Sequence, residues 1–232
     1  MAVVTNAEVL SVIEHGEDVR EFVLKPKVYK RFEAGTFLQL TLENVSASEI
    51  WPDSRTFSIA SCHNKDKTMR LIIKKVGEYT GRLFDELKEG SECTIKYSFG
   101  DFLLPVFDKK NPIVCIAGGT GIAPFLSFLG QLKNEGSLDR MYLLYSVKKF
   151  DNFIDMEILK ENLLDKQTSF HCTREEVNGF KNNRINLNEI IKISQNNKDA
   201  HYYICGSKEF ITDFKEKLFE KGFNNVYTDE WE

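Results

Sequence analysis

Short β-branched or alternating runs dominate the first part of the chain, and clusters of Gly, Pro, Asn and Asp separate them. Such runs predict β-strands, because successive side chains of a strand point to opposite faces of a sheet. Residues 80–88 instead have an apolar helical face, followed by Gly90 as a stop signal. Short strands at this spacing with a single helix favour an antiparallel β-barrel. The predicted strands are residues 9–13, 19–24, 37–42, 70–75 and 94–97.

The pattern changes near residues 105–111, where a polar stretch leads to the wholly apolar run 113–117. From there apolar strands alternate with helical segments, which is typical of a parallel sheet covered by helices on both faces. We therefore predict two domains, a β-barrel over residues 1–107 and an α/β domain over residues 108–232. In the second, the predicted strands are 113–117, 141–145, 169–172, 201–205 and 226–228, and the predicted helices are 124–133, 155–164, 187–193 and 208–221.

Composition excludes several function classes. The net charge of -4 and the lack of a long basic run argue against nucleic acid as a main partner. The apolar runs are too short to span a bilayer, and the first residues lack the basic region of a secretory signal, so we expect a cytoplasmic protein. The five cysteines form no CxxC pair, which argues against a disulfide framework, and we expect no metal site.

A glycine-rich turn, Gly118-Gly119-Thr120-Gly121-Ile122-Ala123-Pro124, follows the apolar run 113–117 and opens a predicted helix. Glycines allow a sharp turn close to a phosphate, and a helix N-terminus offers free N–H groups to the anion. Pro124 suits the first helical turn, but it stands where a GxGxxG fingerprint would have its last glycine. The turn predicts a dinucleotide site, and the alternative is a tight strand–helix connection without a ligand.

Two motifs in the first domain carry groups suited to a phosphorylated planar ligand. In Arg55-Thr56-Phe57-Ser58, the guanidinium can pair with phosphate oxygens, the ring can stack and the hydroxyl can bond a ring nitrogen. In Gly77-Glu78-Tyr79-Thr80-Gly81, a second helix start with glycine and a hydroxyl can hold another phosphate. Taken alone, the first motif is an ordinary strand and the second is N-capping by Thr80.

In this order along the chain, the motifs resemble those of the ferredoxin–NADP reductase superfamily. In that family an Arg-x-Tyr/Phe-Ser segment binds flavin, and a Gly-x-x-Ser/Thr helix start binds the flavin pyrophosphate. The Gly-Gly-Thr-Gly-x-x-Pro loop binds the pyrophosphate of the nicotinamide cofactor, and a late Cys-Gly pair lies by the nicotinamide. The resemblance implies a flavin-binding β-barrel followed by a Rossmann-like parallel sheet.

The resemblance also implies a role for each matching residue. Ser58, near the hydride-accepting N5 of the flavin, and Cys205, beside the reacting carbon of the nicotinamide, would be catalytic. Phe57 stands where Tyr is more common, which keeps the stacking and loses one hydroxyl bond. Trp231, near the C-terminus, could lie over the flavin, contact a partner or belong to a frayed end. The implied cofactor-binding residues are Arg55, Thr56, Phe57, Ser58, Ile72, Ile73, Lys74, Gly77, Tyr79, Thr80 and Gly81 for the flavin, and Gly119, Thr120, Gly121, Ile122, Ala123, Pro124, Cys205 and Gly206 for the dinucleotide.

Three basic residues bear on which dinucleotide is used. Lys148, Arg174 and Arg184 match a pattern of bacterial NADP-dependent members, and Arg and Lys favour a doubly charged phosphate. No acidic residue immediately follows the second predicted strand of this domain, 141–145, where a ribose-binding carboxylate would stand. The alternative is solvated surface charge, and NAD-dependent relatives carry some of these residues. NADPH is therefore favoured, and NADH stays open.

The function implied by the resemblance is that of an FAD-dependent NAD(P)H oxidoreductase, with FMN the less favoured flavin. Its electrons would pass to a separate acceptor, such as ferredoxin, flavodoxin or an oxygenase. An NAD(P)H:flavin reductase that uses flavin as a dissociable substrate is the alternative, although the helix start at 77–81 that such enzymes often lack is intact. A non-catalytic electron-transfer subunit is a third interpretation, and such relatives usually carry a C-terminal cysteine cluster that this sequence lacks.

Overall fold

The structure, a computed structural model, describes residues 2–45 and 50–229 of the chain, which folds into two units. The first unit comprises Met1–Leu104 and Leu126–Gln131, and the second comprises Pro105–Phe125 and Leu132–Glu232. The domain limits that the sequence suggests, 1–107 and 108–232, stay a prediction. Across the described residues, no helix is both long enough and apolar enough to cross a membrane.

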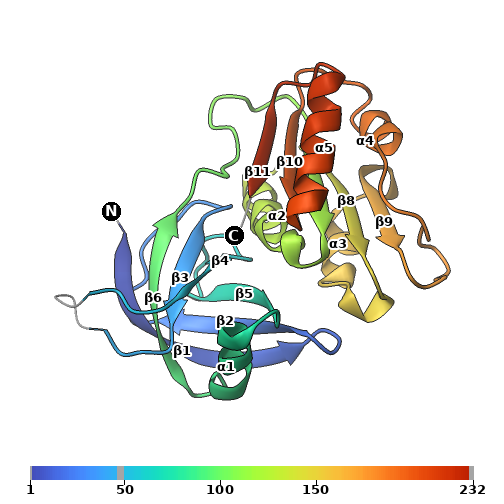
Figure 1. Ribbon diagram of the computed structural model, residues 1–232. Coiled ribbons are helices and arrows are strands. Elements are labelled where there is room, and N and C mark those ends of the chain that lie inside the picture. Colours follow the sequence, from blue (N-terminus) through green and yellow to red (C-terminus); the bar gives the residue numbers. More distant parts are fainter. Residues whose placement is uncertain (1, 46–49, 230–232) are drawn as a thin grey trace. The chain divides into compact units, whose positions relative to one another are not determined.

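The first unit is built on a six-stranded antiparallel sheet in the order β4-β3-β6-β1-β2-β5 (Figure 1). Its edge strands meet through one isolated antiparallel bridge between Ile59 and Leu71, so the sheet nearly closes on itself. The predicted antiparallel barrel is confirmed. The elements are β1 (Val3–Glu14), β2 (Val19–Pro26), β3 (Phe37–Thr41), β4 (Arg55–Ser58), β5 (Met69–Lys74), α1 (Glu78–Glu86) and β6 (Glu92–Phe99).

One carboxylate, that of Glu21 in β2, is buried in the barrel wall. Arg70 of β5 donates to both of its oxygens, from Nε at 2.7 Å and from Nη2 at 2.8 Å, and His15 Nε2 lies 3.3 Å away. Burial raises the pKa of Glu21, but the hydrogen bonds from His15 and Arg70 and the charge of Arg70 outweigh burial and lower this pKa from 4.5 to about 2. The charged pair therefore ties the edge strand β5 to β2.

The second unit is a five-stranded sheet in the order β11-β10-β7-β8-β9, and every pair in it is parallel. β10 is buried along its whole length, and α4 and α5 share a hydrophobic core with β7 and β10. The predicted parallel sheet is confirmed. The elements are β7 (Ile113–Gly118), α2 (Ala123–Glu135), β8 (Met141–Val147), α3 (Met156–Asn162), β9 (Thr168–Cys172), α4 (Leu187–Ile193), β10 (His201–Cys205), α5 (Lys208–Glu220) and β11 (Val226–Asp229).

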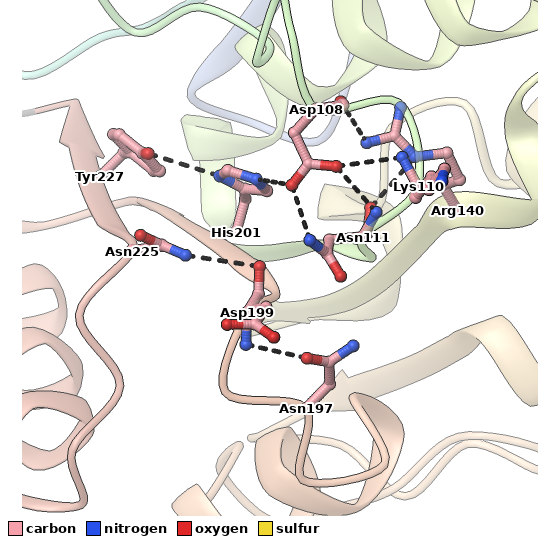
Figure 2. A network of polar contacts seen from close by, with 9 residues as sticks. All are labelled: Asp108, Lys110, Asn111, Arg140, Asn197, Asp199, His201, Asn225 and Tyr227. Carbon is pink, nitrogen blue, oxygen red and sulfur yellow. Dashed lines mark hydrogen bonds and ion pairs between the residues drawn. The ribbon is translucent and has the colours of Figure 1, made fainter.

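A polar network anchors the segment before β7 to the starts of other strands (Figure 2). Asp108 Oδ1 accepts from the backbone N–H groups of Lys110 and Asn111, both at 3.0 Å. Its Oδ2 lies 2.7 Å from Nε2 of His201, the first residue of β10. Arg140, just before β8, donates to the carbonyl oxygens of Asp108 and Asn111. The hydrogen bond from the N–H of Asn111 and, to a smaller extent, the one from His201 hold the pKa of Asp108 well below its ordinary 3.8.

Replacing Asp108 with alanine is expected to lower the free energy of unfolding by about 1–3 kcal/mol at neutral pH, because its donors lose their acceptor. The pKa of this carboxyl is depressed in the folded state, so its contribution is present above the unfolded pKa of 3.8 and is lost as pH falls. Urea unfolding at a series of pH values should show the loss shrinking on acidification. Asp199→Ala is the matched control because Asp199 is exposed on the same edge, and an equal loss in both variants would contradict the role of Asp108.

Candidate cofactor sites

Strand order in the second unit reverses between β7 and β10. β8 and β9 follow on one side of β7, whereas β10 and β11 lie on the other. Open parallel sheets bind ligands outside the carboxyl ends of their strands at such a switch point. β7 ends at Gly118 and β10 ends at Cys205, and Ala117 pairs with Cys205. The predicted glycine loop and the predicted Cys205-Gly206 pair therefore meet at the edge where a ligand is expected.

Two glycines of the loop have different physical roles. A β carbon added to Gly121 would lie 2.3 Å from the carbonyl oxygen of Cys205 and 2.7 Å from the nitrogen of Gly206, so the backbone itself occupies that space. Gly119 has a φ of +58°, and an added β carbon would meet nothing within 4 Å. Gly121 is needed for packing, and Gly119 is a left-handed residue with open space beside it. The open position is one that a phosphate could approach closely.

A 3₁₀ turn, Gly119–Ile122, separates β7 from α2. The carbonyl of Thr120 accepts the N–H of Ala123, where α2 begins, and Pro124 stands in its first turn. The sequence predicted a glycine-rich turn followed by a helix from residue 124, but not the 3₁₀ geometry of that turn. Ile122 and Ala123 are buried, so they shape the loop from beneath, whereas Gly119 and Thr120 are only half-buried.

Cys205 is buried at the end of β10 beside an acidic residue that sequence reasoning missed. Its Sγ lies 3.9 Å from Oδ2 of Asp229, and the parallel register pairs the two residues directly. Burial, with the negative charge of Asp229 as the next cause, raises the pKa of the thiol well above 9.0. Cys205 is therefore a neutral thiol. The one available signal for Asp229 was its place at the end of the last predicted strand, and the parallel register that pairs it with Cys205 is not readable from the sequence.

The three predicted basic residues lie on neighbouring chain segments. The N–H of Arg174, just after β9, donates to the carbonyl of Lys148, just after β8, at 3.0 Å. Arg184 follows a short segment that pairs with β9 through a parallel bridge between His171 and Lys181. Lys148, Arg174 and Arg184 are all exposed. The parallel direction of these segments sends all three toward the same edge of the sheet as the glycine loop.

In the first unit, Arg55 and Tyr79 are brought together. The Arg55 guanidinium lies over the Tyr79 ring, 4.5 Å from its centroid, and forms an ion pair with Asp53 at 2.6 Å. The Tyr79 hydroxyl donates to the carbonyl oxygen of Leu40 at 2.9 Å, and burial raises its pKa above 10.0. The Arg55 side chain remains half-exposed. The cation is thus held in place on its aromatic support while part of it faces solvent.

The helix start near Gly77 has a geometry different from simple capping by Thr80. α1 begins at Glu78 with Gly77 as its N-cap, so Thr80 lies inside the first turn. The Thr80 hydroxyl accepts from the N–H groups of Val76 at 2.9 Å and Gly77 at 3.1 Å. The first backbone bond of the helix runs from Gly81 N–H to Gly77 O, so the helix does not use the N–H groups of residues 78–80. These donors suit an anion.

The other predicted flavin residues lie on the two edge strands of the barrel. β4 carries Arg55–Ser58, and β5 carries Ile72, Ile73 and Lys74. Past the bridge between Ile59 and Leu71, the described residues of β4 and β5 form no ladder with each other. Thr56 and Phe57 are half-buried, Ser58, Ile72 and Ile73 are buried, and Lys74 pairs with Asp18 at 3.2 Å.

The structure thus gathers the predicted flavin residues in the first unit and the predicted dinucleotide residues in the second. Trp231 lies outside the described residues. The roles of the predicted flavin residues and of the predicted dinucleotide residues stay predictions.

Comparison with known proteins adds to this geometry. Residues 115–216 match the family model described as the oxidoreductase NAD-binding domain. The chain is 29% identical over 220 residues to the flavohemoprotein of Bacillus subtilis, an alignment that covers 89% of this chain and 53% of that protein. It is 24% identical to the flavodoxin/ferredoxin–NADP reductase of Buchnera aphidicola subsp. Schizaphis graminum, covering 90% of this chain and 87% of that protein.

A solved structure shares the fold over nearly the whole chain. The crystal structure of a ferredoxin NADP⁺ reductase from Neisseria gonorrhoeae with bound FAD and NADP superposes with a TM-score of 0.78 at 23% identity, covering 97% of this chain and 98% of that one. The chain nevertheless spans only about half the length of the flavohemoproteins that it matches.

Proposed function

Because this chain belongs to the ferredoxin–NADP reductase-like superfamily, we propose that it is an oxidoreductase that binds FAD and takes a hydride from a nicotinamide dinucleotide. Its electrons then pass to a separate acceptor. The observation that carries the proposal is the meeting of the glycine loop and Cys205 at the switch point of a parallel sheet, within a segment that matches an NAD-binding domain.

The residues of the first unit fit a flavin with a pyrophosphate. The N–H groups at the start of α1 and the half-exposed Arg55 supply donors and positive charge for phosphate oxygens. Since no ladder joins β4 to β5 over these residues, Phe57 and the backbone of residues 72–74 would be available to a flat ring. When bound, the flavin would supply the redox chemistry, while the chain would bind and orient it.

The residues of the second unit fit a dinucleotide. Gly119 leaves room for a phosphate beside the start of α2, and the Cys205-Gly206 pair lies on the neighbouring strand end. Cys205, held neutral by burial and by Asp229, would present an uncharged surface to the nicotinamide ring. Ser58 would hold the flavin near its reacting nitrogen, as the family resemblance implies. The protein's share of the chemistry would be approach and orientation.

We infer NADPH as the preferred donor. Lys148, Arg174 and Arg184 lie exposed on three neighbouring segments that run to one edge, and such a group of cations favours a doubly charged 2′-phosphate. We propose a small redox protein or an oxygenase component as the acceptor, and the name of the Buchnera relative, a flavodoxin/ferredoxin–NADP reductase, agrees with the first of these. The alternative, a flavin reductase that releases its flavin, is disfavoured by the intact helix start at Gly77.

The proposal is tested by the absorption spectrum of the purified, desalted protein. The expected result is a flavin spectrum that bleaches on anaerobic addition of NADPH, and more slowly or at higher concentration with NADH. A colourless protein that nevertheless oxidises NADPH when free flavin is added would favour the flavin reductase. Retained flavin that neither dinucleotide reduces would contradict the proposal and favour a non-catalytic electron-transfer subunit.

A further inference from the structure

A buried polar cluster lies behind the segment that carries Arg184. His171 of β9 is completely buried, with its Nδ1 2.9 Å from the carbonyl oxygen of Asn183 and its Nε2 2.9 Å from the hydroxyl of Ser169. Lys181 donates to the same Ser169 hydroxyl at 2.9 Å and to Glu189 of α4 at 2.7 Å. The proposed cofactor chemistry uses none of these residues.

The partners of His171 fix its tautomer. A carbonyl oxygen can only accept, so Nδ1 carries the hydrogen and donates to Asn183. Nε2 of the neutral ring is then an acceptor for the Ser169 hydroxyl, whose oxygen in turn accepts from Lys181. Burial lowers the pKa of His171 and keeps the ring neutral, although Glu189 Oε2 lies 3.6 Å from Nε2.

The backbone around Arg184 is held on both sides. Upstream, Lys181 is paired with the edge of β9, because its N–H donates to Phe170 and its carbonyl accepts from Cys172. Downstream, Ile185 is buried in the core of the second unit. Between them, the peptide that joins Asn183 to Arg184 is tied to His171 through its carbonyl oxygen. Arg184 itself is exposed, so its backbone is fixed while its side chain faces solvent.

We propose that His171 is a positioning residue for dinucleotide choice: it orients the peptide between Asn183 and Arg184 and so aims the Arg184 guanidinium at the 2′-phosphate of NADPH. This inference rests on the proposed function. A guanidinium discriminates by directed hydrogen bonds, so its contribution depends on where its backbone is held. NADH, which lacks the 2′-phosphate, gains nothing from this arrangement.

The test uses two substitutions that separate the ring nitrogens. His171→Asn places an amide N–H at the same distance along the side chain as Nδ1, so it can still donate to Asn183. His171→Gln places its amide near the position of Nε2 and leaves that carbonyl without its donor. With the flavin-loaded full chain, we expect His171→Gln to raise the KM for NADPH about five- to tenfold with kcat and the KM for NADH unchanged, and His171→Asn to stay within about twofold of the unchanged protein.

A second readout needs no flavin chemistry. Calorimetric titration of each full-length protein with adenosine 2′,5′-bisphosphate should show the same loss of affinity in His171→Gln, whereas 5′-AMP should bind all variants alike. Equal effects of the two substitutions, or a matching rise in the KM for NADH, would overturn the inference. Arg184→Ala distinguishes a failure of the proposed NADPH site from a failure of the role of His171. If Arg184→Ala leaves the binding of the bisphosphate unchanged, the proposed NADPH site itself is wrong. If Arg184→Ala weakens binding while His171→Gln does not, only the role of His171 is wrong.

Discussion

Gly121→Ala is expected to lower the free energy of unfolding by about 3 kcal/mol or more, because overfilling a packed site costs roughly 1–3 kcal/mol even where side chains can yield. Here the obstacle is backbone. The added β carbon would lie 2.3 Å from the carbonyl oxygen, 2.5 Å from the carbonyl carbon of Cys205 and 2.7 Å from the nitrogen of Gly206. Relief would have to move the turn Gly119–Ile122 away from the end of β10. Urea unfolding followed by circular dichroism measures the loss.

Gly119→Ala is the matched control in the same loop. Nothing lies within 4 Å of the added β carbon, so the only cost is that of a left-handed φ of +58°, about 1–2 kcal/mol. Stability should therefore fall clearly less than in Gly121→Ala, whereas NADPH affinity should fall in both, because the open position beside Gly119 is the proposed phosphate approach. If Gly121→Ala were as stable as the unchanged protein, the close packing of the loop on β10 would be wrong.

Arg55→Glu is expected to yield protein that loses its flavin on desalting, with flavin affinity about 100-fold lower or worse. The substitution removes a charge-assisted phosphate contact and replaces it with a repelling charge, and a loss of about 2.7 kcal/mol or more corresponds to that factor. It also takes away the cation held 4.5 Å from the centre of the Tyr79 ring. The ratio of flavin absorbance to protein absorbance after desalting is the direct measurement.

Arg31→Glu provides the control for a charge reversal in the same unit. Arg31 is highly exposed and has only a long ion pair to Glu33 at 3.6 Å, so its reversal should leave the flavin content unchanged. Melting curves of both variants distinguish weakened flavin binding from an unfolded barrel. Full flavin retention by a folded Arg55→Glu protein would remove Arg55 from the proposed flavin site.

The sequence revealed those parts of the fold whose signal is local. Residues 113–117 are apolar throughout because a central parallel strand is covered on both faces, and the predicted strand there coincides with β7. By contrast, only residues 9–13 of β1 were predicted. The first half of that strand buries Val3, Thr5 and Ala7. Small and hydroxyl side chains give a weak apolar alternation, so this half was not recognisable.

The candidate site likewise has residues with a local sequence signal and residues whose role depends on long-range pairing. Arg55, Gly77 and the loop from Gly118 could be proposed from the sequence, because a guanidinium and a glycine-rich helix start each have a local physical meaning, and their roles stay predictions. Asp229 and His171 were missed, since their relevance depends on parallel pairing with Cys205 and with the segment before Arg184. Long-range register decides which side chains meet, and one sequence does not contain it in readable form.

The protonated state of Cys205 has a consequence for the durability of the protein. The thiolate, not the thiol, reacts with peroxides and alkylating agents, and burial beside a carboxylate keeps this sulfur out of its reactive form. Reduced flavins produce hydrogen peroxide when they meet oxygen. The proposed flavin would bring such chemistry to this protein, and we expect the burial of Cys205 and the negative charge of Asp229 to slow the oxidation of this thiol.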